Sequence, residues 1–276
     1  AGAVARLCRV PLVIRTRHVL SPVSSAVSYN LFPHVILACS EAIRNGLIEQ
    51  RVAASKIMVQ PTGVDEERFR FSLEKRRRVR EQYDLAEDSV VVGNVGFIRH
   101  YKGHGFILRT AAVMPERFRF MLVGGGRDLP LLQEEADRLG VSDRIVFTGH
   151  RENPEDFFSA FDILFFSSWG VEGVAQSFIQ GLLYGLPLVA CRTPSILEPL
   201  AHVHSSRVID YDDVPAAAEA LSRLAERLQR DEKKIEEQRQ AIAAKYGMRA
   251  MTRNLLGIYS RFGIEPPAGP LTPPRC

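Results

Sequence analysis

Short apolar runs recur along the chain, and helical patterns separate most of them. Apolar runs of about 4–8 residues bounded by turn residues are typical of strands that are buried on both faces. Ser40 is a good N-cap for a helix over 41–49. Because strands that alternate with helices favour a doubly wound parallel sheet, the sequence predicts an α/β fold. The expected strands are 11–15, 35–38, 57–60, 90–95, 120–123, 145–148, 163–166 and 186–190.

The segment after the apolar run 163–166 shows the clearest pattern of strand, loop, helix and strand. Val174, Phe178 and Leu182 are four residues apart, as on one face of a helix. Gly185 stands where a glycine commonly ends a helix. Since ligands bind at the carboxyl ends of the strands in an open parallel sheet, we expect the loop before this helix to face a ligand.

The start of this helix offers groups that suit an anion. We expect the backbone amides of Gly173, Val174 and Ala175 to be free donors for a phosphate or an anionic sugar linkage. Glu172 directly precedes them. Its carboxylate either stabilises the helix N-terminus or takes part in the site, and the spacing alone supports both interpretations.

Three further features are candidates for binding. Arg99 and Lys102 lie in a glycine-bounded loop that can fold a cation over a phosphate, or they are two surface cations. The glycine run 124–126 allows close backbone approach or simply a tight turn. His18 ends a predicted strand beside two arginines, as a structural residue or as a ligand contact. The sequence contains no GxxxxGK[ST] motif, which argues against a P-loop nucleotide hydrolase.

Composition narrows the function classes. Lys and Arg number 36 against 32 Asp and Glu, a near balance that does not indicate nucleic-acid binding. The four cysteines form no CxxC pair, so neither a metal site nor a disulfide framework is indicated. No apolar run reaches the roughly 18 residues of a membrane span, and we expect a cytoplasmic protein. The charged segment 65–81 is expected to be a solvated helix face in a connection between domains.

Several segments together resemble the GT-B glycosyltransferases of glycosyltransferase family 4, in the branch that builds lipopolysaccharide or other surface glycans. The segments are GFIRHYKGH (96–104), FRFMLVGGG (118–126), DRIVFTGH (143–150), FDILFFSS (161–168), EGVAQSFIQGLLYGLPLVA (172–190), RTRH (15–18), ACSEAIR (38–44) and PTGVDEERF (61–69). The resemblance covers about residues 11–260 and implies a complete Rossmann-like donor domain after an incomplete acceptor-side domain.

The resemblance also implies roles for individual residues. Arg99 and Lys102 would hold the donor diphosphate, Glu172 the hydroxyls of the donor sugar, and His18 would approach the sugar from the other domain. The catalytic set is then Glu172, His18, Arg99 and Lys102. The nucleotide-sugar contacts are Gly96, Gly124, Gly125, His150, Gly173, Val174, Ala175 and Gln180.

Two positions depart from the family pattern. The family signature usually has a second glutamate where this chain has Gln180, but an amide can still bond a ribose hydroxyl. Position 97 is Phe where many members have Arg, and Arg99 can supply that charge.

The expected organisation has five parts: the end of the acceptor-side domain (1–65), a linker (66–86), the donor-binding domain (87–230), a C-terminal helix that packs back across the domains (231–264), and a Pro-rich tail (265–276). The acceptor-side domain of the family normally begins with a Gly-rich loop that this chain lacks, so we expect its N-terminal part to be missing.

The predicted function is retaining transfer of a sugar from a nucleotide sugar to a glycan or lipid-linked acceptor. The nucleotide sugar is a substrate, and neither a cofactor nor a catalytic metal is expected. Peripheral association with the inner face of the membrane would suit a lipid-linked acceptor. The alternatives are a nucleotide-sugar-binding module without transferase activity, or another GT-B enzyme such as a nucleotide-sugar epimerase.

Overall fold

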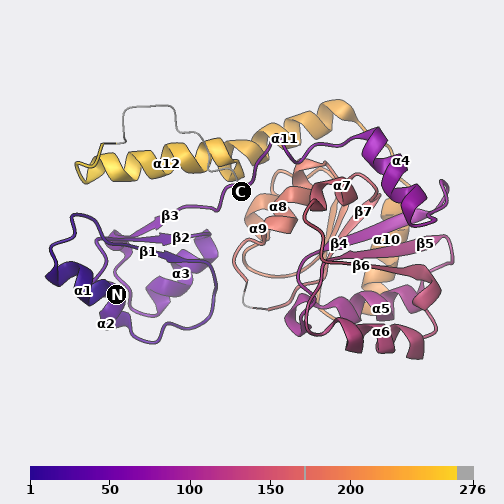
Figure 1. Ribbon diagram of the computed structural model, residues 1–276, viewed down its shortest axis with the longest axis horizontal. Coiled ribbons are helices and arrows are strands. Elements are labelled where there is room, and N and C mark those ends of the chain that lie inside the picture. Colours follow the sequence, from indigo (N-terminus) through magenta and orange to yellow (C-terminus); the bar gives the residue numbers. More distant parts are fainter. Residues whose placement is uncertain (171, 266–276) are drawn as a thin grey trace.

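The computed structural model describes residues 1–170 and 172–265 of the 276-residue chain. It contains two parallel sheets, one of three strands in the order β1-β2-β3 and one of six in the order β6-β5-β4-β7-β8-β9. Each sheet forms the centre of a lobe, and the lobes lie side by side along the long axis (Figure 1). Of the predicted Pro-rich tail, 266–276 lies outside the described residues.

The smaller lobe is built around β2, whose residues are all buried. Ser40 caps the adjoining helix as predicted, because its side chain accepts a hydrogen bond from Ile43 N. The first strand starts later than predicted, at Ile14. Val13 before it bonds to His34 through both backbone groups, its O accepting from His34 N and its N donating to His34 Nδ1, each at 2.8 Å. The elements of this lobe are α1 (Gly2–Leu7), β1 (Ile14–Arg17), α2 (Ala26–Leu31), β2 (Val35–Ala38), α3 (Glu41–Glu49) and β3 (Ile57–Val59).

The larger lobe is a six-stranded parallel sheet. β4 and β5 are neighbouring parallel strands, in register from Val90↔Phe118 to Val95↔Val123, in agreement with the predicted parallel sheet. The strands of this lobe are β4 (Val90–Val95), β5 (Phe118–Val123), β6 (Ile145–Gly149), β7 (Ile163–Phe166), β8 (Leu188–Cys191) and β9 (Ser206–Ile209). The edge strand β9 was not predicted, because its sequence SRVI has no continuous apolar run.

Helices cover both faces of the larger sheet. Alternate strand residues contribute to two separate cores, with Val91 and Met121 in one and Val92 and Phe120 in the other. Side chains of α4, α7, α8 and α11 complete the first core, and those of α5, α6 and α10 complete the second. These helices are α4 (Leu73–Gln82), α5 (His104–Val113), α6 (Leu129–Arg138), α7 (Pro154–Phe158), α8 (Gln176–Leu183), α10 (Val214–Ala225) and α11 (Glu232–Tyr246); the short α9 (Leu197–Leu200) follows β8.

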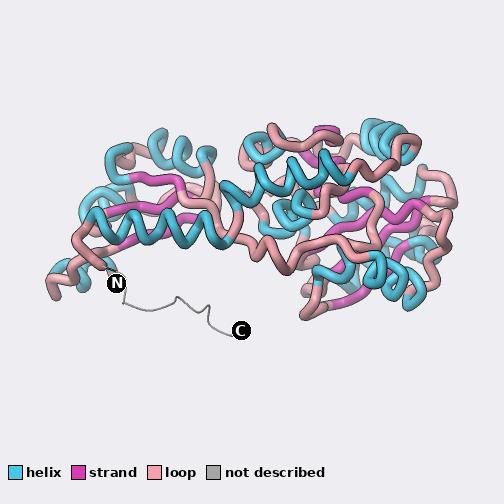
Figure 2. The backbone as a smooth tube through the Cα atoms, turned by 90° about the horizontal axis from the view of Figure 1, so that it is seen from above, coloured by secondary structure: helices cyan, strands magenta, loops and turns pink. Residues whose placement is uncertain are grey.

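The last two helices pass from one lobe to the other. α11 packs on the larger lobe, and α12 (Met248–Arg261) lies along the smaller sheet, where Ile258 is buried with Val35 and Leu37 (Figures 1 and 2). The helix breaks at Gly247, where α11 ends and α12 begins. There Val64 pairs with the chain, its N donating to Tyr246 O and its O accepting from Met248 N, both at 2.9 Å. The lobes are thus joined by two connecting segments, around Val64 and around Gly247, that lie next to each other.

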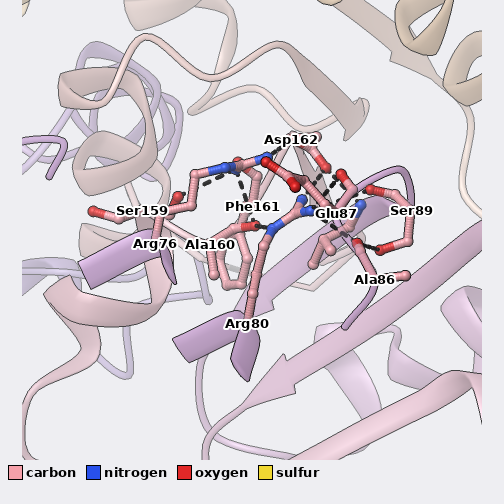
Figure 3. A network of polar contacts seen from close by, with 10 residues as sticks. Arg76, Arg80, Ala86, Glu87, Ser89, Ser159, Ala160, Phe161 and Asp162 are labelled. Carbon is pink, nitrogen blue, oxygen red and sulfur yellow. Dashed lines mark hydrogen bonds and ion pairs between the residues drawn. The ribbon is translucent and has the colours of Figure 1, made fainter. Parts of the chain in front are cut away.

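The charged run forms α4, but the prediction of a solvated face is wrong for two of its arginines. Arg80 has a side chain only 7% exposed, and it shares the carboxylate of Asp162 with Arg76. The guanidinium groups also donate to backbone carbonyls just before β7 and before β4 (Figure 3). The partner carboxylate lies about 80 residues further along the chain, so local charge spacing could not reveal it.

Candidate functional site

The candidate site lies where the strand order of the larger sheet reverses. From β4 the sheet continues to β5 and β6 on one side and to β7, β8 and β9 on the other. The chain after β4 leads to α5 on one face of the sheet, and the chain after β7 leads to α8 on the other. The crevice at such a position is where ligands usually bind in parallel sheets. Residues 96–102 follow β4, residues 124–125 follow β5 and residues 172–175 follow β7, so most predicted site residues lie at this edge.

The loops after β4 and β7 are fastened to each other. Gly103 has φ +71°, and a Cβ there would lie 2.2 Å from Ser167 O, so only glycine allows this approach. Ser167 Oγ donates to Lys102 O (2.7 Å), and Ser168 Oγ is 3.2 Å from Tyr101 O. Lys102 is thereby held against the segment that carries Glu172.

Lys102 and Glu172, both predicted catalytic residues, form an ion pair through Lys102 Nζ and Glu172 Oε1. Their side chains are only 16% and 18% exposed. The other carboxylate oxygen accepts from Ser168 Oγ at 2.7 Å. Because α8 begins only at Gln176, it is these two side chains that hold the Glu172 carboxylate.

The prediction that the Gly173 amide is a free donor for an anion is wrong. This amide donates to His18 O at 3.1 Å, next to an antiparallel bridge between Val19 and Glu172. This contact between the lobes also delays the start of α8, which was expected to include Val174. The backbone of Gly173 therefore fixes the position of His18 instead of offering a donor to an anion.

A cavity of about 300 Å³ brings five predicted site residues together across the two lobes. His18 and Val19 come from the smaller lobe, and all other lining residues come from the larger one. The lining residues are His18, Val19, Tyr101, Glu172, Gly173, Val174 and Ala175. The cavity is thus lined by the carboxylate of Glu172, which pairs with Lys102, and by the exposed His18 of the other lobe.

A larger cavity of about 770 Å³ lies at the opposite edge of the six-stranded sheet. Its lining includes the residues that directly precede β7, β8 and β9, which are Asp162, Pro187 and Ser205. None of the predicted site residues lines it. Because ligands of parallel sheets bind at the carboxyl ends of the strands, the smaller cavity is the better candidate.

The glycine run after β5 packs the neighbouring loops closely. Gly124 has φ +145°, and a Cβ there would lie 2.0 Å from Gly96 O. Gly96 N in turn donates to Val123 O (3.0 Å). Gly125 lies beside the backbone of His150, an exposed residue at the end of β6. Gly96, Gly124, Gly125 and His150 thus form one group of loops next to the crevice.

Arg99 and Gln180 lie outside the 300 Å³ cavity. Arg99 is exposed, and its guanidinium carbon lies 5.9 Å from the ring centre of Phe97. Gln180 is half-buried about one turn into α8. Their proposed contacts with the diphosphate and the ribose require a ligand that extends from the cavity along the crevice.

Four residues that the sequence did not single out support the site. Tyr101 lines the cavity, Ser168 bonds the Glu172 carboxylate, and Ser195 Oγ donates to Glu172 O (3.1 Å). Cys39 Sγ lies 3.0 Å from His18 Nδ1. Single serines and cysteines in loops carry no periodic signal, although Tyr101 could have been noticed between Arg99 and Lys102.

His104, directly after the loop that carries Lys102, is a buried neutral residue. It is 3% exposed, and its Nδ1 is without a hydrogen-bond partner among the described residues. Burial, and to a lesser extent the nearby Lys102 charge, lower the pKa of His104 to about 4. The imidazole is therefore neutral at pH 7, so the cations near the site are Arg99 and Lys102.

Within 1–170 and 172–265, no three His, Cys, Asp or Glu side chains cluster as metal ligands would. Across the same residues, no helix combines the length and the apolar character needed to cross a membrane.

Two α/β lobes with parallel sheets and a shared cavity are the architecture of the GT-B glycosyltransferases. The structure of Anabaena Alr3699/HepE in complex with UDP-glucose matches with a TM-score of 0.84 at 20% identity, over 94% of this chain and 75% of that one. This similarity confirms the predicted fold class. The chain belongs to the group 1 glycosyltransferases, because residues 89–227 match the family described as Glycosyl transferases group 1.

Curated relatives match over part of their length. A GDP-mannose-dependent alpha-(1-6)-phosphatidylinositol monomannoside mannosyltransferase of Mycolicibacterium smegmatis is 30% identical over 59% of this chain and 46% of that protein. The lipopolysaccharide core biosynthesis glycosyltransferase LpsD of Rhizobium meliloti is 27% identical over 64% of this chain and 50% of that protein. The chain thus spans about half the length of these relatives.

Proposed function

We propose that the protein is a retaining glycosyltransferase of the family 4 type, which transfers a sugar from a nucleotide sugar to a glycan or lipid-linked acceptor of the cell surface. The observation that carries this proposal is the cavity in which His18 from one lobe meets Glu172 and its partner Lys102 from the other. The relative LpsD, named for lipopolysaccharide core biosynthesis, supports a surface glycan as the product.

The charges at the cavity suit a nucleotide sugar. Negative charge develops on the departing nucleoside diphosphate, and a preorganised cation stabilises that charge. Lys102 is in position for this role, with the exposed Arg99 as the second cation. In the proposed complex the diphosphate replaces Glu172 as the partner of Lys102, and the freed carboxylate accepts hydrogen bonds from the sugar hydroxyls.

The remaining loops are proposed to hold the nucleoside. Gly96, Gly124, Gly125 and His150 form the group beside the crevice, and Gln180 faces the ribose from α8. We propose the larger lobe, about residues 87–230, as the donor domain and the smaller lobe as the acceptor side.

A nucleotide-sugar-binding module without transferase activity is the second candidate. The observation that favours it is that the Lys102–Glu172 pair and the glycine loops beside the crevice all lie in the larger lobe. Such a module would bind the donor there without passing the sugar to an acceptor.

One experiment separates these functions. Calorimetric titration with UDP, GDP and their sugar conjugates measures donor binding, and incubation of the bound donor with glycan and glycolipid acceptors measures transfer. Binding with transfer, and an anomeric configuration retained in the product by NMR, supports the enzyme. Binding without transfer supports the module, and no binding to any of the nucleotides overturns both proposals.

Removal of either loop cation is expected to weaken nucleoside diphosphate binding. Arg99→Ala and Lys102→Ala each remove a charge-assisted contact, for which we expect a loss of about 1–3 kcal/mol. Calorimetric titration with the tightest-binding diphosphate measures the loss. Arg127→Ala is the matched control, because its side chain is 85% exposed and pairs with the neighbouring Asp128. Unchanged affinity in both test variants would remove these residues from the site.

Glu172 and Gln180 are expected to affect different steps. Glu172→Gln keeps the shape but removes the charge, so we expect turnover to fall about tenfold or more while nucleotide affinity is retained, since Lys102 then has no competing carboxylate. Gln180→Leu should weaken the nucleotide by about 1 kcal/mol, because a ribose hydroxyl loses its partner. Gln180→Glu should be tolerated.

The comparison needs both the nucleotide dissociation constant and turnover for the three variants. If Glu172→Gln leaves turnover intact while Gln180→Glu abolishes it, the roles assigned to these two positions are wrong.

A further inference from the structure

His18 is held at both its backbone and its ring. Its carbonyl accepts the Gly173 amide from the other lobe at 3.1 Å, so the residue stays at the cavity wall. Its Nδ1 lies 3.0 Å from Cys39 Sγ. The ring therefore has one nitrogen engaged by the protein, and Nε2 is the nitrogen left for a ligand in the cavity.

Cys39 is built into the smaller lobe at the carboxyl end of β2. It is 4% exposed, and its amide donates to Arg17 O (3.1 Å). Burial raises the pKa of the Cys39 thiol, so the sulfur carries its proton at neutral pH. Thr62 Oγ1, 3.7 Å away, donates to the same sulfur.

These contacts fix the direction of the hydrogen bond between Cys39 and His18. A thiol sulfur is a weak acceptor, and here it already accepts from Thr62, whereas an unprotonated imidazole nitrogen readily accepts. The arrangement in which Sγ–H donates to Nδ1 therefore satisfies all three groups. The tautomer of a neutral histidine follows from the hydrogen bond made by its other nitrogen.

We propose that Cys39 is a positioning residue that holds His18 in the tautomer with its proton on Nε2, so that His18 presents a hydrogen-bond donor, and not a base, to the cavity. The ligand atom that it meets is then an oxygen with a free lone pair, such as a sugar hydroxyl or a phosphate oxygen. The tautomer is inferred from the contacts of Cys39 with His18 and Thr62, whereas its effect on transfer rests on the proposed function.

The proposal limits the chemistry of His18. A neutral imidazole with Nε2 protonated cannot take a proton at that nitrogen, so His18 does not deprotonate the acceptor hydroxyl. It instead orients the donor through one hydrogen bond, from the lobe opposite to Glu172.

The tautomer is tested directly by NMR on the full chain with ¹⁵N-labelled histidine at pH 8. His18 signals are assigned by their loss in His18→Gln. We expect Nε2 protonated and Nδ1 unprotonated in the wild type and in Cys39→Ser, whose hydroxyl also donates, and a mixture of tautomers in Cys39→Ala. A wild-type proton on Nδ1, or an unchanged tautomer in Cys39→Ala, overturns the proposal.

Turnover gives the second readout. With a donor identified by titration, Cys39→Ala is expected to lose about tenfold in turnover, the scale of one hydrogen bond, and Cys39→Ser to restore most of it. Cys191→Ala is the matched control, because this thiol is equally buried but lies in β8 of the other lobe. Equal losses in Cys39→Ala and Cys39→Ser would assign Cys39 to packing. If the wild type shows no transfer, the proposed function fails, and the NMR result still decides the tautomer.

Discussion

Replacement of Asp162 by alanine is expected to cost about 3–5 kcal/mol of the unfolding free energy of the larger lobe, the range for breaking a buried ion pair from one side. The Asp162 carboxylate accepts from Arg80 (2.5 Å), Arg76 (2.7 Å) and the amide of Val91 (2.8 Å). Its side chain is 13% exposed and that of Arg80 is 7% exposed. Alanine would leave the Arg80 charge buried with only carbonyl partners (Figure 3).

Urea unfolding measures this cost, followed by the fluorescence of Trp169, the single tryptophan of the chain and part of the larger lobe. Asp210→Ala is the control, because its pair with Arg192 has side chains 58% and 77% exposed and should contribute at most about 1 kcal/mol. Asp162→Asn should fall between the two variants, since an amide oxygen can still accept one guanidinium. An Asp162→Ala loss no larger than that of the control would show that α4 does not depend on this carboxylate.

The fold of the larger lobe was predictable because its strands are continuous apolar runs. Val90–Val95 and Ile163–Phe166 are buried on both faces in the structure, and such strands carry a strong local signal. The strand Ser206–Ile209 escaped prediction because it lies at the sheet edge and needs fewer apolar residues. The buried roles of Arg76 and Arg80 depend on a distant carboxylate, which no local pattern contains.

The candidate site was predictable for residues that directly follow a strand. Parallel strands place their carboxyl ends at one edge, so Lys102 and Glu172 could be expected on the same side of the sheet. Their direct ion pair could not be expected, because it depends on how the two loops are fastened through Gly103. The bond from Gly173 to His18 was also hidden, since it joins residues of different lobes.

The second large expected effect is a loss of stability at low pH. We expect the free energy of unfolding to fall by about 3 kcal/mol between pH 6.5 and pH 4 through His104 alone. Burial lowers the pKa of His104 to about 4 in the folded chain, against about 6.5 when unfolded. Between these values the unfolded chain binds a proton that the folded chain does not, so stability is lost as the pH falls, at about 1.4 kcal/mol per unit. Below about pH 4 both states are protonated and this loss ends.

His104→Gln removes the titrating group, so the difference in unfolding free energy between wild type and variant should change across this pH range and stay constant above about pH 7. Carboxylates that titrate in both chains contribute equally to the two free energies, so their contributions cancel in the difference. Asp156 is one of them: its burial raises the pKa, but its ion pairs and hydrogen bonds lower the pKa by more. His150→Gln is the control for the loss of a histidine side chain, because His150 is exposed. A flat difference for His104→Gln would mean that the imidazole takes up its proton at the same pH in the folded and the unfolded chain. Because Lys102 precedes His104 by two residues, that result would place an extra positive charge beside the proposed diphosphate site below about pH 6.5.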